Sequence, residues 1–309
     1  MLKFIIIGGG NLGYRYAQGI LKLDKGFYLT IVDSSRSRLE FLKNNFANEN
    51  KSSLQKLEFL TEVSEKRSFD VAIVSTNSDV RCKVFNEYNK KHNVKFWILE
   101  KVLTPNINEL SLFPNKNNIW VNTFLRTLDV FENIKNTLPK NDVEIFVAGG
   151  NWGLACNSIH YIDLISWIFN KMPIKINSDQ LENEWFNSKR KGFYEVNGTL
   201  KVTYPNNVQL NLTCNSSTDD LTIILTCESV RYEYNLITGE LHSNVAPKSK
   251  ILIPYQSEMT PVIINQIIRT KKSCLTPISE SIEMHRLFLN EIKKCWDRGN
   301  FKNNTFKIT

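Results

Sequence analysis

A glycine-rich turn near the start of the chain is the feature that most constrains the fold. Residues 3–7 form a short apolar run that favours a β-strand, and residues 8–13 read Gly-Gly-Gly-Asn-Leu-Gly. Residues 11–23 then carry apolar side chains at helical spacing. A strand, a G-x-G-x-x-G turn and a helix in this order are typical of the first unit of a doubly wound parallel sheet.

Each glycine of the motif has an expected role. Gly8 permits the tight turn, Gly10 lets the backbone approach a diphosphate without a Cβ in the way, and Gly13 lets helix and strand pack closely. The N–H groups at the helix start, at Asn11 and Leu12, are then directed at the phosphates. We therefore expect a dinucleotide site here; the alternative is that the glycines only make a sharp turn.

An acid follows at the spacing that this kind of site requires. Asp33 lies 20 residues after Gly13, at the end of a second predicted strand. An acid at that place accepts hydrogen bonds from the adenosine ribose, which favours NAD over NADP. Ser34 belongs to the same expected site. Arg36 or Arg38 could instead hold the 2′-phosphate of NADP, so NAD is preferred but NADP stays possible.

Strand-like and helix-like segments continue to alternate through residue 122. This alternation predicts crossover connections, a parallel sheet and an α/β Rossmann domain over residues 1–122. The further predicted strands are residues 70–75, 94–99 and 119–122, and the further predicted helices are residues 36–46 and 80–91.

Polar residues follow two of these strands, at the edge where parallel sheets bind ligands. Ser75, Thr76 and Asn77 come after one strand, where they contact the cofactor or simply begin a helix. Glu100 and Lys101 come after the next strand. Lys101 either points toward the cofactor or is an ordinary solvated lysine.

The second half of the chain predicts a different architecture. Strand-like runs joined by short turns imply an antiparallel sheet, and hence an α+β domain over residues 123–309. The predicted strands are residues 143–147, 198–204, 208–215, 221–227 and 230–235. The predicted helices are residues 156–169 and 278–297, and we expect the second of these helices to contact the first domain. We expect the pair Gly149-Gly150 to end the first of these strands.

Taken together, these motifs resemble the Gfo/Idh/MocA oxidoreductase family along the whole chain. The resemblance rests on the order and spacing of the glycine turn, Ser75-Thr76-Asn77, Glu100-Lys101, the run from Gly153 through His160, Asp163, Leu164 and Trp167, and the segment 276–285. It implies a Rossmann domain followed by a domain with an open, mostly antiparallel sheet, residues 123–309, that binds substrate and mediates oligomerisation. It also implies hydride transfer between NAD(P) and a sugar or nucleotide-sugar hydroxyl or ketone. It also implies a homo-oligomer, either a dimer or a tetramer.

The resemblance assigns catalytic roles to two residues. Lys101 matches the lysine of a Glu-Lys-Pro motif, here with Val102 in place of proline, and His160 matches an acid/base histidine. The alternative for His160 is packing on a half-apolar helix. Cys156 stands where many members carry an aspartate, and a neutral thiol does not replace that charge.

Further side chains are candidates for substrate contacts. Asn157 can hydrogen-bond a substrate, and Asp163 is one helical turn from His160. Trp152 can form a wall for a sugar ring, and Arg126 can hold a phosphate or carboxylate. The alternatives are that Trp152 lies in the core and Arg126 on the surface.

Composition narrows the possible classes. The formal charge of +8 reflects either a lysine-rich surface or attraction of an anionic ligand such as a nucleotide sugar. Six scattered cysteines without a C-x-x-C pair argue against a metal site and indicate reduced thiols in the cytoplasm. Neither a membrane span nor a nucleic-acid-binding motif is expected. The second candidate function is a dinucleotide-binding sensor or accessory protein with impaired catalysis, motivated by Cys156; a structural protein without cofactor is the third.

Overall fold

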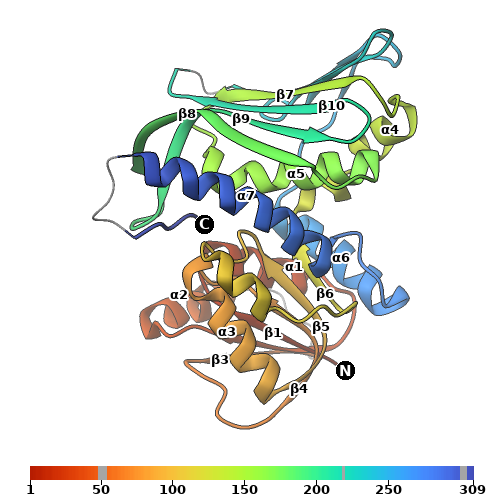
Figure 1. Ribbon diagram of the computed structural model, residues 1–309. Helices are drawn as coiled ribbons and strands as arrows, with labels where there is room; N and C mark the ends of the chain where they lie inside the picture. The colour runs from red at the N-terminus through yellow and green to blue at the C-terminus, as the bar shows by residue number, and fades with distance from the viewer. Residues whose placement is uncertain (48–53, 218–219, 300–304) are drawn as a thin grey trace. The chain divides into compact units, whose positions relative to one another are not determined.

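The chain folds into two compact units, each built around its own β-sheet (Figure 1). The computed structural model describes residues 1–47, 54–217, 220–299 and 305–309. Unit 1 comprises Met1–Thr104, Asn108–Asn122 and Pro254–Ser279, and unit 2 comprises Pro105–Ile107, Thr123–Ile253 and Glu280–Thr309. The sequence placed residues 254–279 in the second domain instead, and the functional assignment of the two domains stays a prediction.

The sheet of unit 1 is parallel except at one edge. Its strands are β1 (Leu2–Ile7), β2 (Phe27–Val32), β3 (Gln55–Leu60), β4 (Ser68–Val74), β5 (Asn93–Glu100), β6 (Ile119–Asn122) and β15 (Thr276–Pro277). Among the described residues they follow the order β15-β6-β5-β4-β1-β2-β3, with β15 antiparallel to β6. Phe4, Ile5 and Ile6 are fully buried, as expected for a strand covered on both faces. The strand order reverses between β1 and β4, which is where such sheets bind ligands.

The helices of unit 1 connect and cover this sheet. They are α1 (Asn11–Leu21), α2 (Arg36–Ala47), α3 (Ser78–Lys91), the 3₁₀ turn η1 (Ile107–Leu112), whose first residue lies in unit 2, and α6 (Gln256–Thr270). From β1 through β2 to β3 the chain moves across the sheet in one direction, and from β4 to β5 it moves in the other. Right-handed crossovers therefore put α1 and α2 on one face of the sheet and α3 on the other. α6 packs on α1, where a Cβ at Gly19 would meet Thr260 Cβ at 2.5 Å. Gly19 therefore allows the close approach of these helices.

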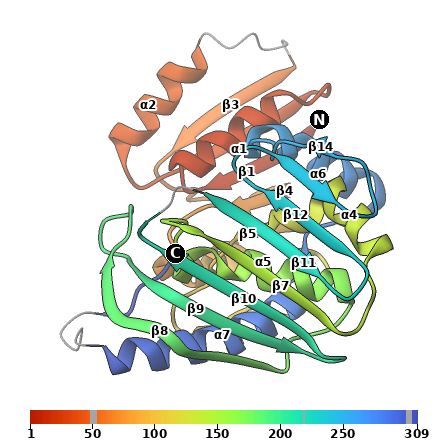
Figure 2. The same cartoon turned by 90° about the horizontal axis from the view of Figure 1, so that it is seen from above.

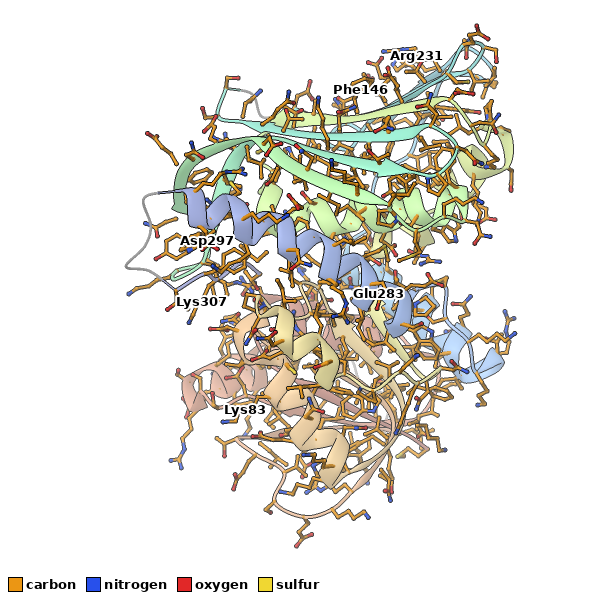
Figure 3. All side chains as sticks on the ribbon, in the orientation of Figure 1. Lys83, Phe146, Arg231, Glu283, Asp297 and Lys307 are labelled. Atoms are coloured by element: carbon orange, nitrogen blue, oxygen red, sulfur yellow. The ribbon has the colours of Figure 1, made fainter. Side chains whose placement is uncertain are left out.

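Unit 2 contains a mostly antiparallel sheet. Its strands are β7 (Val143–Gly150), β8 (Lys175–Asn187), β9 (Tyr194–Tyr204), β10 (Val208–Asn215), β11 (Leu221–Thr226), β12 (Arg231–Asn235), β13 (Glu240–Ser243) and β14 (Ser249–Lys250). Figure 2 shows β8, β9, β10, β7, β11 and β12 side by side in this order. Among the described strands of this second sheet, only β7 and β10 pair in parallel. Side chains along β7 alternate between buried and exposed, and Phe146 lies on the exposed face (Figure 3).

Helices cover the buried face of this second sheet. They are the 3₁₀ turn η2 (Phe124–Thr127), α4 (Asp129–Thr137), α5 (Leu154–Phe169) and α7 (Ile278–Arg298). α5 is buried almost all round and packs against β9 and β10. α7 lies along β8, where the rings of Trp185 and Trp296 are 5.0 Å apart and Arg298 Nη2 donates to the carbonyl of Ser178 at 2.7 Å.

The structure confirms the predicted fold class and corrects several elements. β7 continues through Gly149-Gly150, because Gly149 lets the carbonyl of Asp220 approach where a Cβ would overlap it. The unpredicted elements include α6, whose Pro261 would normally argue against a helix, and also α4, β3, β8, β13, β14 and β15. All six cysteines are thiols. No helix among the described residues is long and apolar enough to cross a membrane.

Candidate functional site

The glycine turn of unit 1 has one open position between two crowded ones. A Cβ at Gly8, whose φ is +104°, would meet Thr76 N at 2.8 Å, and a Cβ at Gly13 would overlap the carbonyl oxygen of Gly8. A Cβ at Gly10 would meet nothing within 4 Å. Gly8 and Gly13 are therefore required for packing, whereas Gly10 leaves space beside the backbone.

That open position is also the start of α1. Gly10 is the N-cap residue with an extended backbone, and the first turn of α1 holds no acidic side chain. The N–H groups of the first turn have no intrahelical acceptor, so this end of the helix favours an anion. The turn thus offers both space and partial positive charge, as a diphosphate requires.

Asp33 and Arg38 both contact the glycine turn. The Asp33 carboxylate accepts hydrogen bonds from the backbone N–H groups of Gly9 at 2.7 Å and Ser35 at 2.9 Å. Arg38 donates through Nε to the Gly9 carbonyl at 2.5 Å and through Nη2 to Asn11 Oδ1 at 3.3 Å. The carboxylate that would bind a ribose and the cation that would bind a 2′-phosphate therefore lie at the same turn.

The loop after β4 is attached to the glycine turn. Ser75 Oγ donates to the carbonyl of Gly8 at 2.7 Å, and Ser75 N donates to the carbonyl of Ile7 at 2.9 Å. Asn77 occupies the N-cap position of α3, as one of the sequence alternatives proposed. The buried Arg81 donates to the carbonyls of Thr76 and Val102 and so links the loops that follow β4 and β5.

Glu100 takes part in a buried polar network. It is 4% exposed and accepts hydrogen bonds from the Tyr16 hydroxyl and from Asn122 Nδ2, the latter at 2.7 Å. Asn122 Nδ2 also lies 2.9 Å from Gln256 Oε1. Burial, followed by the charge of Glu100, raises the pKa of Tyr16 well above its ordinary value of 10.0. Glu100 therefore holds the end of β5, and its contact with a cofactor stays a prediction.

Lys101 follows this network directly. Its side chain is half-buried, and its peptide bond to Val102 is cis. Because Glu100 and Val102 on either side are held by Asn122 and Arg81, the backbone position of Lys101 is fixed. Its catalytic role stays a prediction.

In unit 2, α5 carries His160 and a buried ion pair. His160 is 9% exposed, and its ring packs edge-to-face on Phe124 with centroids 5.0 Å apart. One turn further, Asp163 is fully buried and lies 3.2 Å from Arg126 Nη1 on η2. Arg126 also lies 3.4 Å from Glu280 and is 11% exposed, so it is not a surface arginine.

The first turn of α5 is held by residues from the sheet and the preceding loop. Glu195 on β9 accepts hydrogen bonds from the N–H groups of Ala155 at 2.7 Å and Cys156 at 3.2 Å. Trp152 Nε1 donates to the carbonyl of Thr213 at 2.8 Å, and Asn157 Nδ2 donates to the carbonyl of Trp152 at 2.6 Å. Trp152 is half-buried, and its contact with substrate stays a prediction.

The structure thus brings the predicted residues together in two groups. The glycine turn, Asp33, Arg38 and Ser75 meet in unit 1, and His160, Asp163 and Arg126 meet in unit 2. Sequence reasoning missed Tyr16, Arg81 and Glu195, because each acts through a partner far away in the chain. Within the described residues, no group of three or more His, Cys, Asp or Glu side chains could hold a metal ion.

Comparison with known proteins identifies the fold. No family model matches the chain, and no curated protein matches it. Solved structures match nearly the whole chain. UDP-N-acetylglucosamine 3-dehydrogenase from Acidithiobacillus ferrooxidans is 12% identical with a TM-score of 0.72, covering 96% of this chain and 98% of that one. Scyllo-inositol dehydrogenase from Lactobacillus casei, solved with NAD(H) and scyllo-inositol, is 11% identical with a TM-score of 0.68, covering 96% and 97%.

A third similar structure is an oxidoreductase from Agrobacterium radiobacter in complex with NAD+, L-tartaric acid and magnesium. It is 13% identical with a TM-score of 0.69, covering 95% of this chain and 96% of that one. The chain therefore has the two-sheet fold of these oxidoreductases, which is the fold that its resemblance to the Gfo/Idh/MocA family implied.

Proposed function

We propose that the protein is an NAD(P)-dependent oxidoreductase that acts on a hydroxyl or ketone group of a sugar or nucleotide sugar. The observation that carries this proposal is the open space at Gly10, between Gly8 and Gly13, at the start of α1. The similar structures, two of them solved with NAD or NAD(H), support the choice of cofactor.

The residues of unit 1 fit a dinucleotide. Gly10 and the N–H groups of Asn11 and Leu12 would hold the diphosphate, and Asp33 would accept hydrogen bonds from the adenosine ribose. Arg38 would instead contact a 2′-phosphate if NADP binds. When bound, the nicotinamide supplies hydride chemistry.

The remaining task of the protein is to move a proton. In the proposed reaction Lys101 Nζ holds the substrate hydroxyl, and the imidazole of His160 takes or returns its proton. Asp163 is buried and paired with Arg126, so it would fix the turn of α5 that carries His160 and would not touch substrate. Trp152, Asn157 and Arg126 stay predicted substrate contacts.

Two assays test the proposal. Calorimetric titration with NAD+ and NADP+ measures cofactor binding, and NADH absorbance measures turnover on a panel of cyclitols, free sugars and nucleotide sugars. Lys101→Ala and His160→Ala are each expected to reduce kcat by about 100-fold or more while dinucleotide affinity is retained. If the two residues serve one proton transfer, the double variant loses far less than the product of the single losses. Variants with the turnover of the parent would contradict the assignment.

The second candidate is a dinucleotide-binding sensor or accessory protein without catalysis. Cys156 favours it, because the position that carries an acid in many similar enzymes is here a buried thiol. Saturable NAD binding together with no turnover on the whole panel would support this candidate. Turnover that depends on Lys101 would exclude it.

Location and assembly belong to the same proposal. We propose a cytoplasmic homo-oligomer, dimer or tetramer, with no nucleic-acid or membrane partner. Light scattering coupled to size-exclusion chromatography would measure the mass of the assembly directly. A mass of one 35.8 kDa chain would contradict the oligomer.

A further inference from the structure

A short segment near residue 309 folds back onto the first turn of α5. Tyr194 N at the start of β9 donates to the carbonyl of Lys307 at 2.9 Å, and Arg190 Nη1 donates to Thr309 Oγ1 at 3.0 Å. Thr309 N lies 3.5 Å from Cys156 Sγ. Lys307 is labelled in Figure 3. Residues 305–309, the 305–309 segment, are thereby tied to three separate parts of unit 2.

Apolar contacts fix the same segment. Ile308 is fully buried, and Phe306 packs against Trp296 and Trp185 with ring centroids 5.6 and 6.2 Å away. Burial of a branched aliphatic side chain and aromatic packing stabilise one docked position. The 305–309 segment is therefore part of the unit 2 structure at Cys156.

The place where the segment docks lies within the candidate substrate region. Cys156 and His160 are four residues apart on α5, so they share a face and are about 6 Å apart along the helix axis. Asn157, a predicted substrate contact, is the next residue. A group fixed against Cys156 thus limits the space one helical turn before His160.

We infer that the 305–309 segment, anchored by the buried Ile308, is a wall of the substrate site, and that its residue beside Cys156, Thr309, limits the size of the substrate accepted at that end of α5. This inference rests on the proposed function. The wall consists of side chains and backbone of this chain, and it would exclude water and large substituents from the first turn of α5.

Thiol reactivity tests the position of the wall without any substrate. Deletion of residues 305–309 is expected to raise the rate of Cys156 alkylation by N-ethylmaleimide about tenfold or more, measured by peptide mass spectrometry. Cys82, buried in unit 1 with its pKa raised to about 11 by burial, should stay slow in both proteins and so reports any general unfolding. Half-exposed Cys227 is the reactive reference. An unchanged Cys156 rate would overturn the inference.

Activity tests the role of the wall. Ile308→Ala is expected to change the ratio of kcat/KM for UDP-N-acetylglucosamine to that for scyllo-inositol about tenfold in favour of the larger compound. The matched control is Thr305→Ala, at an exposed position of the same segment. Dinucleotide affinity should stay at the parent value in both variants.

The outcomes separate this inference from the proposed function. An unchanged ratio in Ile308→Ala, or a Cys156 that is uncovered with no kinetic effect, would overturn the wall and leave the enzyme intact. A parent that binds NAD+ but turns over neither compound would contradict both the activity toward these substrates and the wall. The alkylation rates would then still report where the segment docks.

Discussion

The carboxylate of Asp163 on α5 is fully buried and lies 3.2 Å from the guanidinium of Arg126, one helical turn beyond His160. Each of these two residues was predicted to contact substrate, yet each is the other's partner. A buried pair of this kind is costly to break from one side, because the remaining charge loses its counter-charge. The pair therefore fixes η2 against α5 in the part of unit 2 that carries His160.

Breaking this pair should destabilise the fold strongly. Asp163→Asn is expected to lower the free energy of unfolding by about 3–5 kcal/mol, measured by urea denaturation. Glu280→Gln is the matched control, because Glu280 lies 3.4 Å from Arg126 but is 47% exposed, and it should cost less than about 1 kcal/mol. An equal loss in the free energy of unfolding in the two variants would contradict the claim that the buried Asp163 pair stabilises the fold more than the exposed Glu280 contact.

The buried Arg81 should affect cofactor binding without touching the cofactor. Arg81→Met removes the donor that the carbonyls of Thr76 and Val102 share, and it removes a positive charge near Tyr16 and Glu100. We expect a loss of about 3 kcal/mol of stability and a dinucleotide Kd that is about tenfold weaker. Lys83→Met, at an exposed position of α3, should leave both unchanged. A stable variant with the parent affinity would contradict the positioning role.

The Tyr16 phenol should make the fold sensitive to high pH. Its pKa is raised well above 10.0 in the folded protein, first by burial and then by Glu100. Above about pH 10 the unfolded chain releases this proton while the folded chain keeps it, so stability is full below that pH and falls above it. Tyr16 therefore contributes up to about 1.4 kcal/mol per pH unit to the fall of the free energy of unfolding with rising pH.

Tyr16→Phe should remove the contribution of Tyr16 to the loss of stability at alkaline pH. Urea denaturation at several pH values between 9 and about 11 measures it, and Tyr255→Phe is the control because Tyr255 is 71% exposed. A variant with the alkaline slope of the parent would show that Tyr16 is not the titrating group.

Asp33 should decide between the two dinucleotides. The parent is expected to bind NAD+ about tenfold or more tightly than NADP+, because a 2′-phosphate would meet the Asp33 carboxylate. Asp33→Asn removes the negative charge and should reduce the difference between the affinities for NAD+ and NADP+. Tighter NADP+ binding by the parent, lost in Arg38→Ala, would instead assign the phosphate to Arg38, which also contacts the turn.

Much of unit 1 could be predicted from the sequence, because its signals are local. The glycine turn, the apolar strand before it and Asp33 all lie within a single βαβ unit, and the structure places them as expected. Residues 254–279 are different, because they join unit 1 only after the chain has passed through unit 2. No local pattern reports that β15 pairs with β6.

The candidate site was harder to predict where its contacts are long-range. Tyr16 and Glu100 are 84 residues apart, and Glu195 caps Cys156 from 39 residues away. A surface position was the alternative for Arg126, because most arginines are exposed, but its partner Asp163 lies inside unit 2. Such pairs depend on the tertiary structure and leave no periodic signal in the sequence.

The central claim is that the turn at Gly10 binds a dinucleotide, and one substitution tests it most directly. Gly10→Val should fold normally, within about 1 kcal/mol of the parent, because a Cβ there meets nothing within 4 Å and the backbone is extended. Its side chain would occupy the space expected for the diphosphate. Calorimetric titration with NAD+ should show saturable binding by the parent and about 100-fold weaker binding by the variant. Equal affinity in the two folded proteins, or no uptake of either dinucleotide by the parent, would contradict the account.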